Sequence, residues 1–125
     1  MTRRLEGLTV EAAVASVTTA LGAEGFGILS DIDVQATLDA KIGVAIPGYR
    51  ILGACSPALA HQALSAEPAI GLLMPCNVVV TEAGDGATVV SIADPVALFE
   101  PLKRDDLSDF ALEVRAQLRR ALDSL

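Results

Sequence analysis

The sequence predicts an α+β domain in which helices pack on a mixed, mostly antiparallel sheet of about five strands, in the order β-α-β-α-β-α-β-β-α. Segments with helical spacing alternate with short apolar segments that are typical of strands. The turn sequence EAGDGA, residues 82–87, separates two β-branched segments and predicts a late hairpin. The length of 125 residues fits a single domain over residues 1–125.

The chain begins with a predicted strand over residues 2–6, followed by a helix. Thr9 can cap this helix, and Gly22 and Gly25 end it. Apolar residues at helical spacing give the helix one apolar face: Val10, Val14, Val17 and Leu21.

A second strand is predicted over residues 25–33, with Phe26, Ile28 and Ile32 on one face. Asp33 then caps a short helix, for which Gly43 suits the C-terminal position. The helix carries three apolar residues: Val34, Leu38 and Ile42.

The middle of the chain predicts a third strand over residues 49–55 and a helix directly after it. Ser56 is a suitable N-cap, and Pro57 is pre-organised for the first helical position. This helix stops before Pro68, because the residue before a proline disfavours helical backbone.

A long apolar strand is predicted from Ile70 to Thr81, interrupted by Pro75, and a returning strand over residues 87–94. Proline cannot donate to a ladder, so Pro75 implies a bulge or an edge position. A regular strand would place one apolar row toward the core: Leu72, Met74, Cys76, Val78 and Val80.

The last helix opens at Asp105 or Asp106 and carries a continuous apolar stripe. Its acidic residues lie at the start and its arginines toward the end, as the helix dipole prefers. The stripe comprises Leu107, Ala111, Val114, Leu118, Leu122 and Leu125.

Composition points to self-association and against several partners. Hydrophobic residues make up 52% of the chain and the mean hydropathy is +0.51. A short chain cannot bury that much apolar surface within itself, so we expect a homodimer.

Other classes of partner are disfavoured by the sequence. No run reaches the ~18 apolar residues of a membrane span. The net charge of −7, with few aromatic residues, disfavours nucleic acid. No signal peptide is evident, so both cysteines read as reduced cytoplasmic thiols.

The two cysteines mark the most plausible chemical centre, and Cys55 is the stronger candidate. Cys55 immediately precedes a predicted helix start, where a thiolate is stabilised, although a small apolar strand residue is the alternative. Cys76 falls in the apolar row and reads as a core residue unless Pro75 turns it outward. Ser56 and Asn77, which follow the cysteines, complete the predicted ligand-binding set.

His61 is the only histidine and, with Cys55 and Cys76, is the third candidate ligand for a soft metal. Helical spacing places His61 on the polar face of its helix, and no fourth ligand or CxxC spacing is present. Asp31 and Asp33 could hold a hard cation, but Asp33 already serves as a helix cap. The metal therefore stays unknown, and the sequence requires no cofactor.

Three segments together resemble the domain of unknown function 302 family: GFGILSDIDV, ILGACSPALAHQAL and IGLLMPCNVVVTE. The resemblance extends over nearly the whole chain. It implies a small bacterial or archaeal α+β domain, often dimeric and without an established activity. The family pattern usually has Asn after the first cysteine, where this chain has Ser56.

Three functions follow from these observations, in order of preference. The first is a homodimeric binding module for a small ligand, a soft metal or a sulfur species near Cys55 and Cys76. The second is an interaction protein in which both cysteines only pack. The third is a thiol-dependent enzyme with Cys55 as nucleophile and His61 as base, which requires the two side chains within hydrogen-bond reach.

Overall fold

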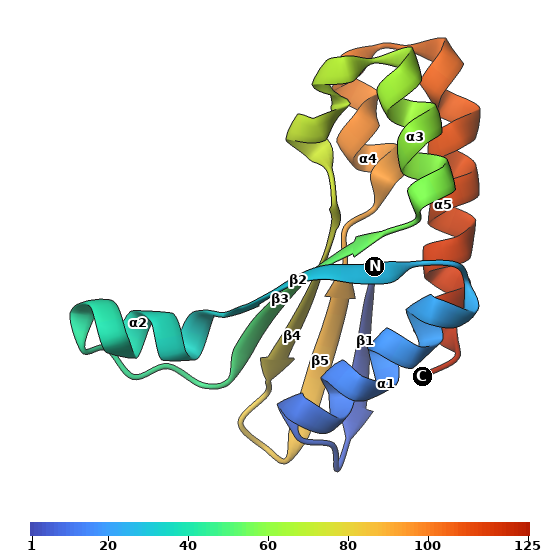
Figure 1. Cartoon of the computed structure of the whole chain (residues 1–125). Helices are drawn as coiled ribbons and strands as arrows, with labels where there is room; N and C mark the ends of the chain where they lie inside the picture. The colour runs from blue at the N-terminus through green and yellow to red at the C-terminus, as the bar shows by residue number, and fades with distance from the viewer.

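The computed structural model describes residues 1–125 and contains one five-stranded antiparallel sheet (Figure 1). The strand order is β1-β5-β4-β3-β2, and every neighbouring pair is antiparallel. The strands are β1 Thr2–Glu6, β2 Gly27–Asp33, β3 Tyr49–Cys55, β4 Cys76–Glu82 and β5 Ala87–Ile92. The predicted α+β class and element order are confirmed, including the late β4–β5 hairpin.

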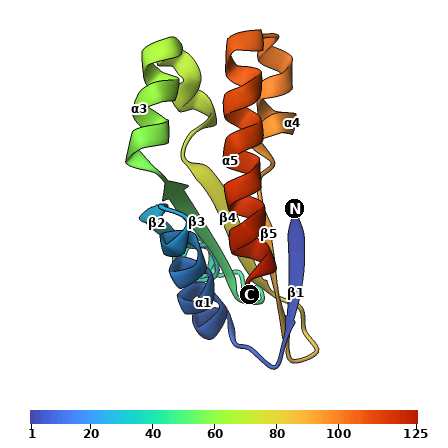
Figure 2. The same ribbon diagram turned by 90° about the vertical axis from the view of Figure 1, so that its right-hand side faces the viewer.

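Two long helices cover one face of the sheet, which we call the inner face (Figures 1 and 2). The α-helices are α1 Val10–Ala23, α2 Val34–Ile42, α3 Pro57–Ala66, α4 Pro95–Phe99 and α5 Asp105–Asp123, with 3₁₀ helices η1 Pro68–Leu73 and η2 Glu100–Leu102. The covering helices are α1 and the C-terminal half of α5. Beyond the end of the sheet, α3, α4 and the start of α5 form what we call the helical lobe. No helix combines the length and the apolar character that crossing a membrane requires.

Local capping chemistry explains where the early helices begin and end. The Ala12 amide donates to the Thr9 hydroxyl oxygen at 3.1 Å, and the Ala36 amide donates to the Asp33 carboxylate at 2.9 Å. Gly43 ends α2 in the left-handed conformation at φ +64°, which favours glycine. These predicted caps are confirmed.

The core lies between the inner face of the sheet and the helices α1 and α5. Cross-strand partners share a face of a sheet, and Leu52, Val78 and Ile92 form one such fully buried row. Leu21 of α1 and Leu118 of α5 are likewise inaccessible to solvent. The predicted stripe of α5 packs here, since its members from Leu107 to Leu122 are all buried.

The long strand predicted from Ile70 to Thr81 is wrong in its first half. Residues 68–73 form η1, the Met74–Pro75 peptide is cis, and β4 begins only at Cys76. Leu72, predicted to face the core, is 88% exposed. Two prolines explain the difference, because Pro68 suits the first position of a helical turn and Pro75 cannot donate to the ladder.

The prediction for β2 is also wrong in one respect, because the strand contains a bulge. Ile28 pairs with Ala54 and Ser30 with Gly53, so Leu29 is an extra residue without a partner in the register. Ile28 packs against the core, whereas Ile32 pairs with Ile51 on the opposite face and is 50% exposed. The bulge therefore separates the two isoleucines that regular alternation places together.

The face opposite α1 and α5 is covered by no helix, and we call it the outer face. Across β2 to β5 its side chains include no charged group; the two central rows contain Ile32, Tyr49, Ile51, Val79, Thr81, Val89 and Ser91. Charge begins at edge strand β1, where Arg4 lies beside Val89 and pairs with Glu6 and Asp85. α2 projects from this side of the sheet, away from all the other helices (Figure 1). No residue of α2 is buried.

Candidate functional site

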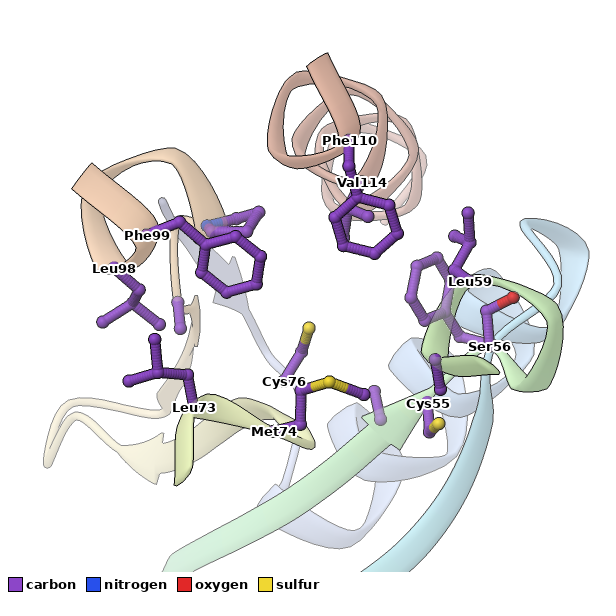
Figure 3. Close-up of a pocket in the computed structure, with 15 residues that line it drawn as sticks. Cys55, Ser56, Leu59, Leu73, Met74, Cys76, Leu98, Phe99, Phe110 and Val114 are labelled. Carbon is purple, nitrogen blue, oxygen red and sulfur yellow. The ribbon is translucent and has the colours of Figure 1, made fainter. Parts of the chain in front are cut away.

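A small apolar cavity lies where the ends of β3 and β4 meet the helical lobe (Figure 3). Thirteen of its fifteen lining residues are hydrophobic, and the free volume is about 30 Å³. This space suffices for very few atoms, since one water molecule needs ~10–15 Å³ by a comparable measure. The lining is Phe26, Ala54, Cys55, Ser56, Leu59, Ala60, Leu73, Met74, Cys76, Ala93, Pro95, Leu98, Phe99, Phe110 and Val114.

The Cys76 thiol is the chemically distinctive group of this cavity. Cys76 opens β4 and pairs with Ala54, which places its side chain on the inner face. Figure 3 shows the Cys76 sulfur pointing into the cavity, toward the Phe99 and Phe110 rings. Burial, with a smaller contribution from nearby Cys55, raises the pKa of Cys76 to about 11. The thiol is therefore protonated at neutral pH and behaves as a soft, weakly polar group.

Two aromatic rings form the side of the cavity opposite the strands. The rings of Phe99 in α4 and Phe110 in α5 are stacked, with centroids 6.1 Å apart and planes 7° from parallel. Both residues are buried. Sulfur atoms contact aromatic rings favourably, and Met74 adds a thioether sulfur to the two thiols of the lining.

Cys55, the stronger candidate from the sequence, has a different orientation. It ends β3, is half-buried, and follows Ala54 in the strand, so the two side chains leave the sheet on opposite sides. Figure 3 shows its sulfur pointing away from the centre of the cavity. Both cysteines are free thiols. They lie near each other at the ends of adjacent strands and both line the cavity, but only the Cys76 sulfur points toward its centre.

The other predicted site residues do not gather around the cavity. Ser56 lines its edge and makes no capping hydrogen bond, whereas Asn77 is exposed and pairs with Gly53 on the outer face. His61 is exposed on α3 and shares no hydrogen bond with either cysteine. No three His, Cys, Asp or Glu side chains lie together as a metal site requires.

The Asp31 and Asp33 carboxylates are both engaged in local structure. The Arg50 guanidinium donates two hydrogen bonds to the Asp31 carboxylate and holds the pKa of Asp31 below its usual value. Asp33 caps α2 through the Ala36 amide. The D-x-D spacing therefore has a structural explanation in both positions.

Sequence reasoning missed the aromatic side of the cavity, which α4 and α5 supply. The signal for α4 was present, because Asp94 and Pro95 repeat the cap-then-proline pattern of Ser56 and Pro57. The Val96 amide donates to the Asp94 carboxylate at 3.0 Å. What local patterns do not indicate is that α4 brings Phe99 to within stacking distance of Phe110.

The fold and the site define a class: a small α+β domain in which a helical lobe closes an apolar, thiol-containing cavity at one end of an antiparallel sheet. The model of the domain of unknown function DUF302 family matches residues 1–125, so the chain belongs to this family. This confirms the resemblance read from the sequence.

A solved structure supports the same fold. The crystal structure of an uncharacterised conserved DUF302 protein from Bacillus stearothermophilus superposes with a TM-score of 0.90. The alignment covers 98% of this chain and 94% of that chain, at 24% sequence identity. None of the curated proteins compared matches the sequence.

Proposed function

We propose that this domain is a binding module for a small, uncharged ligand of apolar or sulfur-containing character, held in the cavity beside Cys76. The observation that carries the proposal is the Cys76 thiol, enclosed by apolar side chains and facing two aromatic rings. Ligand sites are usually apolar concavities with few polar groups, which fix the orientation of the ligand. Here Ser56 is the one hydroxyl of the lining.

The chemistry of the lining favours a sulfur group over a hydroxyl group on the ligand. A hydroxyl that enters an apolar site without a hydrogen-bond partner loses free energy, on the order of 1–3 kcal/mol. A thiol or thioether loses far less and gains contacts with the Phe99 and Phe110 rings.

Binding is better supported than catalysis. A protonated Cys76 thiol is a poor nucleophile, because the thiolate is the reactive form. His61 lies outside the cavity and is exposed, so it is not placed to act as a base for Cys76. The homodimer and the cytoplasmic location stay predictions from the composition.

The proposal is tested by titrating the ¹⁵N-labelled protein with 1-propanethiol, and with 1-propanol as the matched probe, in a reducing buffer. We expect 1-propanethiol to shift the amide resonances of cavity residues, and 1-propanol to bind at least about tenfold more weakly, as ~1.4 kcal/mol of lost hydrogen bonding implies. Ala60→Leu fills the cavity from α3 and is expected to abolish the shifts. Ala58→Leu changes an exposed position of the same helix and is expected to leave them intact.

Two further variants test the part of the thiol. Cys76→Ser is expected to weaken 1-propanethiol binding, and Cys55→Ser is expected to have little effect, since Cys55 points away. Unchanged binding in Ala60→Leu contradicts a ligand site in this cavity, and equal binding of both probes contradicts its preference for sulfur. Unchanged binding in both cysteine variants contradicts the role of the thiols.

A further inference from the structure

The segment Val34–Pro47, which we call the arm, comprises α2 and the loop that returns to β3. It is almost uncharged, with only Asp39 and Lys41 among its residues. Its apolar side chains are open to solvent, including Ile42 at 66% and Val44 at 43% exposure. An exposed apolar surface of this kind indicates a contact with another molecule.

The arm is well formed internally, although it has little support from the rest of the chain. α2 is only 9 residues long, and isolated helices shorter than ~12–15 residues are marginal in water. Its ends are capped by Asp33 and Gly43, and the Gln35 side chain donates to the Ile46 carbonyl oxygen at 2.9 Å. Burial of an apolar face is the usual source of helix stability, and none of these hydrogen bonds provides it. A partner that covers the arm would bury its apolar side chains and so stabilise α2.

The outer face of the sheet is the second uncovered apolar surface of the same molecule. Ile32, Ile51 and Val79 are adjacent in register across β2, β3 and β4. Tyr49, Thr81 and Val89 form the neighbouring row. An antiparallel sheet can leave one face to water, but such a face normally alternates to polar side chains. Here the two rows are uncharged across β2 to β5 and their side chains are mostly aliphatic; Ser91 continues the first row, and Arg4 of edge strand β1 ends the second.

We infer that the arm of one chain packs on the outer face of a second copy of the chain, in a two-fold pair that exchanges arms. The arm projects from the outer-face side of the sheet, so two chains that face each other direct their arms toward each other's sheets (Figure 1). A two-fold interface uses the same surface on both chains, so one pairing covers both apolar surfaces at once. The arm and the outer face together offer about 20 residues a chain, close to the ~20–30 residues a side of stable interfaces.

Charge favours a second copy over a membrane surface as the occupant. Surface-binding helices use clusters of Lys and Arg toward anionic lipid, whereas Lys41 is the only cation of the arm and Asp39 offsets it. The net charge of −7 also opposes anionic lipid. Two chains of this net charge repel each other overall. An uncharged contact surface brings no like charges close together, so it keeps this repulsion small.

Sedimentation equilibrium of the full chain, with variants of each surface, tests the inference. We expect the unmodified chain to be dimeric at about 10 µM, and Ile42→Asp in the arm to raise the dimer dissociation constant at least about tenfold. Val79→Lys on the outer face is expected to do the same. Leu112→Asp, at a 46% exposed position of α5 outside both surfaces, is the matched control and is expected to stay dimeric.

Far-UV circular dichroism accompanies each variant, and Val44→Asp and Val79→Thr replace any variant that loses its fold. A monomeric unmodified chain overturns the inference, as does a dimer that survives both arm variants. Monomers in the arm variants together with intact dimers in the Val79 variants overturn the docking of the arm on the outer face. A monomeric chain that sediments with phosphatidylserine vesicles assigns the arm to a membrane instead, and also overturns it.

Discussion

At the scale of single residues, Cys76 owes its chemistry to where β4 begins. Regular strand pairing with Ala54 places the thiol on the inner face, and the helical lobe then removes it from water. The sequence correctly predicted that the Cys76 side chain lies on the core side of the sheet, because alternation along the strand places it on the same face as Val78 and Val80. It could not indicate the cavity, because the enclosing residues Phe99 and Phe110 come from segments distant along the chain.

The protonation of Cys76 predicts a specific dependence of stability on pH. The thiol titrates near its ordinary value of 9.0 in the unfolded chain and near 11 in the folded one, so the unfolded state loses its proton first as the pH rises. The free energy of unfolding therefore decreases between these values, by about 2–3 kcal/mol. Urea unfolding of Cys76→Ala across this range is expected to lack the decrease, and Cys55→Ala to retain it. A decrease of equal size in Cys76→Ala contradicts the assignment.

At the scale of elements, the contact between β3 and the segment before β4 depends on the close approach of Pro75 to Gly53. A Cβ at Gly53 would stand 2.8 Å from the Pro75 ring carbon and would also collide with the Ser30 hydroxyl. Pro75 thus packs over a glycine on the outer face just before β4 begins. The sequence predicted disruption at Pro75, but the contact with Gly53 requires knowing that β3 and β4 are neighbours.

This close approach predicts opposite effects for two glycine-to-alanine changes. Gly53→Ala is expected to destabilise the protein by about 1–3 kcal/mol, because the rigid Pro75 ring must move. Gly22→Ala lies in α1 with no atom within 4 Å of the added methyl, and is expected to stabilise by ~0.5–1 kcal/mol. Chemical denaturation measures both, and a neutral Gly53→Ala contradicts the tight packing.

At the scale of the whole molecule, α5 joins the sheet to the helical lobe. Near its start, Arg104 forms an ion pair with Glu67 at 3.0 Å, on the segment that follows α3. Near its end, Arg120 pairs with Glu24 at 2.9 Å beside α1, and Arg3 of β1 donates to the Leu122 carbonyl oxygen at 3.1 Å. Exposed ion pairs of this kind contribute little energy each, so the buried stripe of α5 supplies most of the connection.

Because one helix spans both parts, we expect the sheet and the lobe to unfold together. In a Cys55→Ala background, pulsed iodoacetamide labelling of Cys76 through a urea titration reports opening of the cavity, and far-UV circular dichroism reports loss of the whole fold. The two midpoints are expected to coincide. Labelling of Cys76 at clearly lower urea would show that the lobe opens independently.

Much of the fold could be predicted because its elements follow local rules. The caps at Thr9 and Asp33 and the amphipathic stripe of α5 were readable directly. The errors at Leu72 and Ile32 arose where regular alternation was extended through a 3₁₀ helix and through a bulge. The helix of the arm was likewise predicted, but local spacing does not reveal whether an apolar side has a partner within the chain.

The bulge at Leu29 lets β2 hold one residue more than its pairing with β3 requires. Deleting Leu29 would leave Ser30, Asp31 and Ile32 opposite the same residues of β3, because the extra residue has no partner. Asp31 would keep its ion pair with Arg50, and Ile32 would stay on the outer face. We therefore expect homologues in which the spacing between Phe26 and Asp33 is one residue shorter to keep the same two faces of β2.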